Sequence, residues 1–329
     1  MINGKTILIT GGTGSFGNKF TQAILTKYKP KKVIIFSRDE FKQYEMAKIF
    51  SENKYPIRYF LGDVRDAKRL NRAFEGVDYV VHAAALKQVP ALEYNPMEAV
   101  KTNILGADNI VEAAIDQKVE KVVALSTDKA SNPINLYGAT KLAAEKVFIA
   151  ANAYGGGRVK FCVVRYGNVM GSRGSVIPFF LSLKEQGATE YPITDERMTR
   201  FWISLEESVE LVLKALIHGA GGESFIPIIP SMRLIDLARA IDAKAKFKII
   251  GIRPGEKLHE SLISQDEGYN MRTFQDTYVI LPQFFDNKEI HKKYDHCPKV
   301  PEGFIYRSDL NEKWLSVDKL KKIVSQIHL

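Results

Sequence analysis

The sequence predicts an α/β fold with a doubly wound parallel sheet and a smaller region interleaved with it. Short apolar runs alternate with helical patterns through the first half of the 329 residues, as in βαβ units whose sheet is covered on both faces. A glycine-rich turn separates the first run from the first helical pattern, and the alternation loosens after about residue 168. This is the Rossmann arrangement, in which ligands bind beyond the carboxyl ends of the strands.

Six strands are expected in the first half of the chain. Their runs are KTILIT at 5–10, KKVIIFSRD at 31–39, YPIRYFLGDVRD at 55–66, VDYVVHAAA at 77–85, KVVALSTDK at 121–129 and VKFCVVRYGNV at 159–169. Helical patterns lie between them, such as FGNKFTQAILTKY at 16–28 and NPMEAVKTNILGADNIVEAAIDQ at 95–117. We therefore assign residues 1–167 to a dinucleotide-binding domain.

The second half is richer in Gly, Pro and Arg, as in GSRGSVIPFF at 171–180 and IIGIRPGEKLHE at 249–260. We assign residues 168–329 mainly to a substrate-binding region that lies over the strand ends. The pattern ISLEESVELVLKALI at 203–217 is an amphipathic helix that we expect to return to the main sheet.

Composition excludes several classes of function. The net charge is +9, but the lysines are spread along the chain, so we expect no nucleic-acid partner. No apolar run approaches the roughly 20 residues that span a bilayer, and a strand begins almost at once, so we expect neither a membrane segment nor a signal peptide. Cys162 and Cys297 cannot form a disulfide framework and have no zinc-type spacing. A reducing cytoplasm and the absence of a metal fit this composition.

The turn TGGTGSFG at 10–17 predicts a dinucleotide site. Gly11, Gly14 and Gly17 follow a strand and open a helix, where a bare backbone and free helical N–H groups can approach a pyrophosphate. The alternative is a tight turn that only packs helix on strand. We include the other side chains of the turn, Thr13, Ser15 and Phe16, in the cofactor site.

The end of the second strand favours NADP over NAD. Ser37 and Arg38 stand where an NAD site usually has an acidic residue, and a guanidinium suits a 2′-phosphate. Asp39 leaves the alternative of ribose binding open. We assign all three residues, with Lys42, to the cofactor site.

The stretch STDKASNPINLYGATK at 126–141 predicts the catalytic centre. Tyr137 and Lys141 are one helical turn apart, and a nearby ammonium would lower the pKa of the phenol so that it acts as a base. Thr127 can hold a substrate oxygen. The alternative for Tyr137 and Lys141 is an ordinary pair on a helix surface.

The glycine turn together with Tyr-x-x-x-Lys resembles the extended short-chain dehydrogenase/reductase family of nucleotide-sugar epimerases, dehydratases and reductases. Thr127-Asp128-Lys129 narrows the resemblance, together with AAALKQVPALEYNP at 83–96, VVRYGNVMGSRGSVIPFF at 163–180, PITDERMTRFW at 192–202 and RPGEKLHE at 253–260. These motifs resemble the inverting UDP-N-acetylglucosamine 4,6-dehydratases that begin pseudaminic acid synthesis, on the route to flagellin glycans.

The resemblance implies a catalytic role for each of these side chains. Tyr137 takes the C4 hydroxyl proton, Asp128 is the acid at the C6 oxygen and Lys129 is the base at C5. We expect burial, Lys141 and the cationic nicotinamide to lower the pKa of Lys129, and apolar surroundings to raise that of Asp128. A salt bridge on a surface turn is the alternative for Asp128 and Lys129.

The resemblance also implies binding residues and an assembly. Cofactor contacts extend to Asp63, Val64, Ala83, Ala85, Lys87, Thr102, Tyr137 and Lys141. The UDP-sugar is expected at Lys87, Asn168, Ser175, Val176, Thr194, Arg253 and Glu256. A solvated lysine and a surface arginine are the alternatives for Lys87 and Arg253, and His82 is expected to be a packed strand residue. Related enzymes imply a homo-oligomer, a dimer or a hexamer.

Three other functions stay open at this point. A retaining UDP-GlcNAc 4,6-dehydratase would use the same cofactor, and a UDP-hexose 4-epimerase would have no use for Asp128 and Lys129. A non-enzymatic NADP sensor would not need Tyr137 and Lys141.

Overall fold

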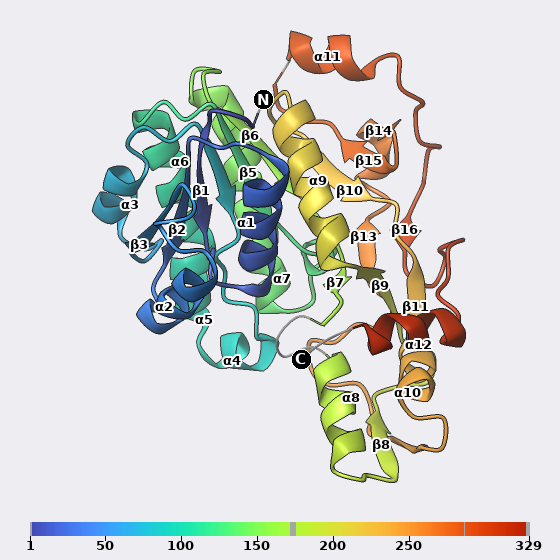
Figure 1. Cartoon of the computed structure of the whole chain (residues 1–329). Helices are drawn as coiled ribbons and strands as arrows, with labels where there is room; N and C mark the ends of the chain where they lie inside the picture. Colours follow the sequence, from blue (N-terminus) through green and yellow to red (C-terminus); the bar gives the residue numbers. More distant parts are fainter. Residues whose placement is uncertain (1, 172–175, 286, 327–329) are drawn as a thin grey trace.

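The large sheet is the frame of the molecule (Figure 1). The computed structural model describes residues 2–171, 176–285 and 287–326. Within them the sheet has nine strands in the order β14-β15-β10-β6-β5-β4-β1-β2-β3, of which the seven from β10 to β3 are parallel. Their bounds are β1 Thr6–Thr10, β2 Lys32–Ser37, β3 Ile57–Leu61, β4 Tyr79–His82, β5 Lys121–Leu125, β6 Lys160–Val164, β10 Ser224–Pro227, β14 Met271–Phe274 and β15 Thr277–Ile280. This topology confirms the predicted fold class.

Both faces of the sheet are buried, because successive side chains of a strand point to opposite faces. Ile7 and Ile9 of β1 pack into the core on the side of α1 (Ser15–Lys27) and α9 (Leu205–His218). Leu8 packs into the opposite core with α3 (Ala67–Ala73), α6 (Gly106–Asp116) and α7 (Leu136–Tyr154). Helix α2 (Glu40–Ile49) contacts β2 and β3. The continuous apolar runs reflect this two-sided burial.

Two segments differ from the sequence-based expectation. The run at 159–169 is divided into two strands, and the first, β6, ends at Val164. The second, β7 (Asn168–Val169), belongs to another sheet, where it pairs with β9 (Thr199–Ile203), and β9 pairs on its other side with β11 (Ser231–Arg233). A Cβ at Gly167 would lie 2.6 Å from the Phe201 Cβ, so a glycine is needed where the chain leaves the large sheet. The helix expected at 95–117 is α5 (Pro96–Ala99), a π-helical turn at Val100–Leu105 and then α6.

A smaller body of the second half lies beside the sheet (Figure 1). It comprises α8 (Val176–Glu185), β8 (Glu190–Ile193), α10 (Leu234–Ile241), β12 (Lys246–Ile249) and α12 (Val317–Ser325), around a core of its own. The remaining elements are α4 (Val89–Tyr94), η2 (Asp128–Ala130), β13 (Ser261–Ile263), η3 (Gly268–Asn270), α11 (Lys288–Tyr294) and β16 (Tyr306–Arg307). Helix α9 and strands β10, β14 and β15 join the large sheet or cover it, so the two halves interleave. No helix of the described residues has the length and apolar character to cross a membrane.

A buried ionic cluster connects the sheet to the second half. Arg165, just after β6, donates to Glu145 of α7 at 3.1 and 2.6 Å and to Glu267 at 3.0 and 2.8 Å. It also donates to the Leu262 carbonyl of β13 at 2.9 Å. Arg165 and Glu145 are almost fully buried, so each charge depends on the others for its compensation.

Arg165→Met should therefore lower the free energy of unfolding by about 3–5 kcal/mol, because it leaves Glu145 buried without its cation. Urea denaturation followed by circular dichroism measures this loss. Arg197→Met is the control, since Arg197 makes a comparable two-point contact with Asp195 at the surface and should change stability little. Equal losses for the two variants would contradict a special role for the buried cluster.

Candidate active site

The glycine turn between β1 and α1 has the geometry of an anion-binding site. Gly11 has φ +65°, and a Cβ there would lie 2.8 Å from the Ala84 amide nitrogen. A Cβ at Gly17 would lie 2.3 Å from the Gly12 carbonyl oxygen. Gly14 is the N-cap of α1, and no side chain caps the helix and no acidic residue occupies its first turn. The turn thus leaves helical N–H groups and bare backbone for a pyrophosphate.

The predicted 2′-phosphate residues divide into two kinds. Asp39 caps α2 by accepting from the Lys42 amide at 2.9 Å, and its carboxylate also pairs with the Lys42 ammonium at 2.9 Å. Ser37 accepts from the Gln43 side chain at 3.0 Å. Arg38 is half-exposed, 3.7 Å from Asp63 at the end of the next strand. Helix capping therefore occupies Asp39, whereas Arg38 lies at the surface beyond the strand ends.

The other predicted cofactor residues line the same edge. Ala83 and Ala85 follow β4 and are partly buried, and Val64 and Thr102 are buried. Thr13, Ser15 and Phe16 lie in the glycine turn or the first turn of α1. Asp63 accepts from Arg65 at 2.9 and 2.6 Å. Lys87 is exposed at this edge, and partial desolvation, helped by the cation of Lys129, lowers its pKa, so these two ammonium groups are neighbours.

His82 is a packed strand residue. Its Nδ1 lies 2.8 Å from the Thr10 hydroxyl. Burial, helped by the Lys141 cation, lowers the pKa of its imidazole to about 3. It is therefore neutral at physiological pH.

Asp128 and Lys129 form a buried pair at the end of β5. The Lys129 ammonium donates to Asp128 Oδ1 at 3.0 Å, and the Thr127 hydroxyl donates to the same oxygen at 2.9 Å. The carboxylate is only 1% exposed and Lys129 is 23% exposed. This geometry argues against the alternative that Asp128 and Lys129 form a salt bridge on a surface turn.

The pKa of Asp128 is raised, as expected, because burial outweighs the lowering by Lys129. The expected lowering of the Lys129 pKa is wrong for this structure. Burial does act to lower it, but Asp128 and Glu260 act together and raise the pKa of Lys129. The ammonium is thus the stable form between two carboxylates.

The expectation for Tyr137 also needs correction. Burial raises the pKa of its phenol, and the groups that oppose this shift are Lys129 and a hydrogen bond with Thr127 rather than Lys141. Lys141 is buried in α7, and burial lowers its pKa to about 8, against the opposing effect of Glu145. The cation that acts on the tyrosine thus comes from the end of β5, not from the next turn of the helix.

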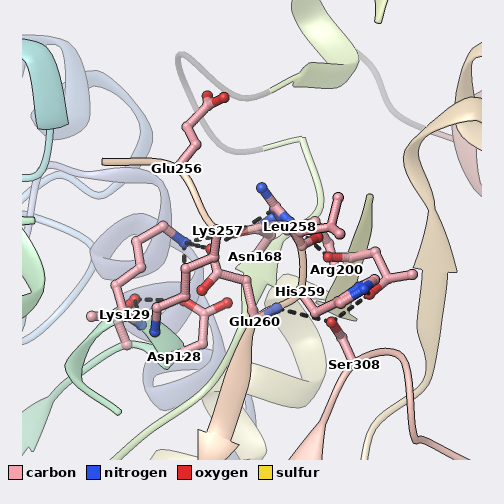
Figure 2. Close-up of polar contacts among 12 residues, drawn as sticks. Asp128, Lys129, Asn168, Arg200, Glu256, Lys257, Leu258, His259, Glu260 and Ser308 are labelled. Carbon is pink, nitrogen blue, oxygen red and sulfur yellow. Dashed lines mark hydrogen bonds and ion pairs between the residues drawn. The ribbon is translucent and has the colours of Figure 1, made fainter. Parts of the chain in front are cut away.

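The predicted substrate residues are spread more widely. Asn168 of β7 has its Oδ1 3.5 Å from the Lys129 ammonium. Glu256 points away from Asp128 and Lys129 (Figure 2), and its carboxylate lies 3.4 Å from the Arg253 amide in an exposed turn. Thr194 is buried after β8, and Val176 begins α8. Ser175 lies outside the described residues.

Glu260 is a member of the site that our sequence analysis did not assign. Its Oε1 lies 3.4 Å from the Lys129 ammonium (Figure 2). The signal was present, because Glu260 ends the quoted motif RPGEKLHE, whose Lys257 also donates to the Ser131 carbonyl at 2.6 Å.

Unpaired polar atoms gather at this end of the sheet. Nine buried side-chain atoms of the described residues have no hydrogen-bond partner, and three of them belong to Ser126, Asp128 and Ser131. Thr102 and Glu260 contribute two more. Such atoms require polar partners, which a nicotinamide ribose and a sugar have in abundance. The described residues hold no group of three or more His, Cys, Asp or Glu arranged to bind a metal ion.

Comparison with known proteins agrees with this geometry. Residues 7–282 match the family described as "Polysaccharide biosynthesis protein". The chain belongs to that family. An inverting UDP-N-acetylglucosamine 4,6-dehydratase of Campylobacter jejuni strain 81-176 is 54% identical over 331 residues, which cover 99% of this chain and 98% of the relative. The resemblance to the extended short-chain dehydrogenase/reductases and to these dehydratases is confirmed.

Two further similarities bear on fold and function. Pen from Bacillus thuringiensis, known from an X-ray structure, has a TM-score of 0.90 and 38% identity, with 99% of this chain and 98% of that chain covered. A UDP-glucose 4-epimerase of Rickettsia massiliae is 48% identical over 288 residues, covering 84% of this chain and 82% of the relative.

Because its pKa is raised, Asp128 should destabilise the fold at pH values above the ordinary range of a carboxyl group. The folded state holds the Asp128 proton more tightly than the unfolded chain does. The protonated side chain therefore stabilises the fold at low pH, and this stabilisation is lost as pH rises through the pKa of Asp128 in the folded state. We expect Asp128→Asn to have a higher melting temperature than the unmodified protein at pH 8 and a smaller advantage at pH 4.

Thermal unfolding at both pH values measures this difference. Glu145→Gln is the control, because Glu145 is also buried but is fully paired with Arg165, so that variant should melt at a lower temperature. A lower melting temperature for Asp128→Asn at pH 8 would contradict the prediction.

Proposed function

We propose that this chain is a UDP-N-acetylglucosamine 4,6-dehydratase that inverts C5, an NADP-dependent hydro-lyase. The observation that carries the proposal is the partly buried hydrogen bond of 3.0 Å between Lys129 and the buried Asp128, next to Tyr137. Elimination of water needs an acid and a base beyond the tyrosine, and this pair supplies one of each. The 54% identity to the Campylobacter jejuni enzyme supports the substrate and the inverting outcome.

The chemistry begins at C4, because the C5 proton is not acidic until C4 is a ketone. Tyr137 takes the C4 hydroxyl proton, and Thr127, whose hydroxyl bonds with Tyr137 and Asp128, holds the sugar oxygen in place. NADP bound at the glycine turn would accept a hydride from C4 and return it to C6, so the reaction consumes no net reductant. Lys141 and Tyr137 would also hold the nicotinamide ribose.

One proton transfer creates both elimination groups. The Lys129 ammonium gives a proton to Asp128 across their hydrogen bond, which leaves a neutral amine and a carboxylic acid. The amine removes the C5 proton, and the acid protonates the C6 oxygen, which leaves as water. Lys129 ends as the ammonium and Asp128 as the carboxylate, so both groups return to the state in which they began. When the hydride returns to C6, C5 would take a solvent-exchanged proton on the face opposite to the one that Lys129 deprotonated. Release to solvent of the C4 proton that Tyr137 received balances this proton. The raised pKa of Asp128 makes the first transfer less costly.

We propose the following contacts for the nucleotide. Asn168 and Arg253 would bind the diphosphate, Glu256 the ribose, and Ser175 and Val176 the uracil. Lys87, one of whose neighbours is Lys129, would contact the sugar or the cofactor, and Thr194 would complete the sugar pocket. Since Glu256 points away from the catalytic pair, we place the nucleotide on that side of the site and the sugar over Asp128.

The cofactor proposal is NADP. Arg38 would bind the 2′-phosphate, Ser37 and Lys42 would lie beside it, and Asp63 and Val64 would hold the adenine. The capping role of Asp39 favours this reading over ribose binding.

The wider assignments are also proposals. We place the boundary of the cofactor domain at residue 167, the enzyme in the cytoplasm and the active form in a homo-oligomer. The product, UDP-2-acetamido-2,6-dideoxy-β-L-arabino-hex-4-ulose, would enter pseudaminic acid synthesis for flagellin.

A UDP-hexose 4-epimerase is the second candidate, because the Rickettsia massiliae relative with that name is 48% identical. Epimerisation at C4 needs Tyr137 and a rotating ketosugar. It gives no task to a buried Asp128 and Lys129, so we rank it below the dehydratase.

Product NMR with UDP-N-acetylglucosamine tests the proposed function. In D₂O we expect deuterium at C5, because the proton that Lys129 removes is lost to solvent and is replaced by a solvent-derived one. We expect the L-arabino 4-keto sugar at early times, because the new proton arrives on the opposite face. Lys129→Gln should lower kcat by about 10²-fold or more, the size of a lost general base. Early formation of only the D-xylo epimer would favour a retaining dehydratase, and UDP-N-acetylgalactosamine would favour an epimerase.

Arg38→Ala tests the cofactor preference. Loss of the guanidinium should weaken NADP binding by about tenfold or more, the value of a charge-assisted hydrogen bond, and leave NAD binding nearly unchanged. Titration calorimetry with the two nucleotides measures both constants. Arg58→Ala is the control, since Arg58 is another exposed arginine of the neighbouring strand and pairs with Glu52. Equal losses for NADP and NAD would remove Arg38 from the 2′-phosphate site.

A further inference from the structure

Lys129 lies between two buried carboxylates, and the proposed mechanism uses only one of them. Asp128 Oδ1 is 3.0 Å from the ammonium and Glu260 Oε1 is 3.4 Å from it. The Glu260 side chain is 3% exposed, and its second oxygen is buried without a partner. A buried carboxylate is costly unless it is compensated, so its presence beside Lys129 needs an explanation.

The backbone fixes Glu260 without using its carboxylate. The Glu260 amide donates to the Ser308 hydroxyl at 3.0 Å, and the Ser308 amide donates to the Glu260 carbonyl at 2.8 Å. Ser308, labelled with His259 in Figure 2, is in turn 2.7 Å from the Thr199 hydroxyl, which lies 2.8 Å from His259 Nδ1. This network holds the main chain, and the carboxylate is left to face cations.

The two carboxylates have different surroundings. Burial raises the pKa of Asp128, which Lys129 opposes. Burial acts in the same direction on Glu260, but Lys129, Arg200 and Lys257 together outweigh it and lower its pKa. The titratable and charged groups around Lys129 are Asp128, Glu260, Arg200, Lys87, Lys257 and Tyr137. Opposite environments of two neighbouring acids mark different roles.

We propose that Glu260 is the permanent counter-charge of Lys129, a positioning residue that allows Asp128 to gain and lose the proton of elimination. The inference rests on the proposed function and deepens it. After the Lys129 amine has taken the C5 proton, and before Asp128 protonates the leaving oxygen, Lys129 is an ammonium beside a neutral carboxylic acid. If Asp128 were the only carboxylate nearby, that ammonium would have no counter-charge. With Glu260 ionised, held by Arg200 at 3.9 Å, the ammonium keeps a partner whenever it is charged. Asp128 can then act as the acid while Lys129 stays in place.

Glu260→Gln tests the proposal through the pH dependence of kcat for the elimination. Lys129 and Asp128 are active in the form that has one proton to share between them, which exists between two apparent pKa values of the pair. Loss of the nearby negative charge lowers both values, so the whole pH–rate profile should move to lower pH by about one unit or more. The maximal rate should also fall.

Two variants separate charge from structure. Glu260→Asp keeps the charge and shortens the side chain, so its rate should fall while its pH–rate profile stays where it is. Glu267→Gln removes a carboxylate from the Arg165 cluster instead, so it should lower the melting temperature without moving the profile. An unshifted profile for Glu260→Gln, or the same shift in Glu267→Gln, would overturn the proposal.

A measurement on the unmodified protein avoids dependence on the folding of a variant. Carbon-13 NMR of labelled Asp and Glu carboxyl groups should show Glu260 ionised at a pH where Asp128 is already protonated. The reverse order would overturn the proposal. Failure of the proposed function is distinguishable, since it appears as the wrong product of the unmodified enzyme, whereas failure of the Glu260 role leaves the product unchanged.

Discussion

The site depends on the buried guanidinium of Arg165. It bonds Glu145 of α7, Glu267 and the Leu262 carbonyl of β13 at once. Helix α7 carries Tyr137, and the chain just before β13 carries Glu260. Arg165 itself follows β6, the neighbour of β5, and the chain after β5 carries Asp128 and Lys129. One side chain therefore fixes three segments, and a catalytic site needs its groups held within about 0.5 Å of the productive geometry. A buried ionic cluster is a weak source of net stability, and here it sets position.

The electrostatic surroundings explain why the centre lies where it does. The carboxyl ends of the parallel strands place the glycine turn and Lys129 at one edge of the sheet, where the proposed cofactor and sugar would meet. Burial at that edge raises the pKa of Asp128 and leaves polar atoms of Ser126 and Ser131 unpaired. Each of these features costs folding free energy and is compensated only when a ligand is bound. In the absence of a ligand, the Arg165 cluster and the two apolar cores of the sheet must keep the site folded.

The fold could be predicted from sequence because its determinants are local. An apolar run such as VIIF at 33–36 can hardly form anything but a strand buried on both faces, and the glycine turn specifies its own backbone. The division of the run at 159–169 could not be predicted, because it depends on the close approach of Gly167 to Phe201. Asp128 and Lys129 were assigned from a short motif, but the direction of the Lys129 shift was wrong. Its second carboxylate, Glu260, lies far along the chain. The motif RPGEKLHE contains Glu260, but no periodicity reveals that this residue faces Lys129.

The protonation state of Lys129 also links the two halves of the proposed reaction. Its positive charge opposes the raised pKa of Tyr137, so the ammonium form favours the phenolate that takes the C4 proton. Once Lys129 passes its proton to Asp128, that assistance ends and the phenol holds its proton more tightly. The amine, the acid and the protonated tyrosine are then present together, which is the combination that elimination requires after oxidation. When the amine takes the C5 proton and Asp128 gives its proton to the leaving oxygen, the charge on Lys129 returns. In the proposed reaction, transfer of one proton within the 3.0 Å hydrogen bond between Lys129 and Asp128 would thus order oxidation before elimination, and Glu260 would keep the ammonium in position.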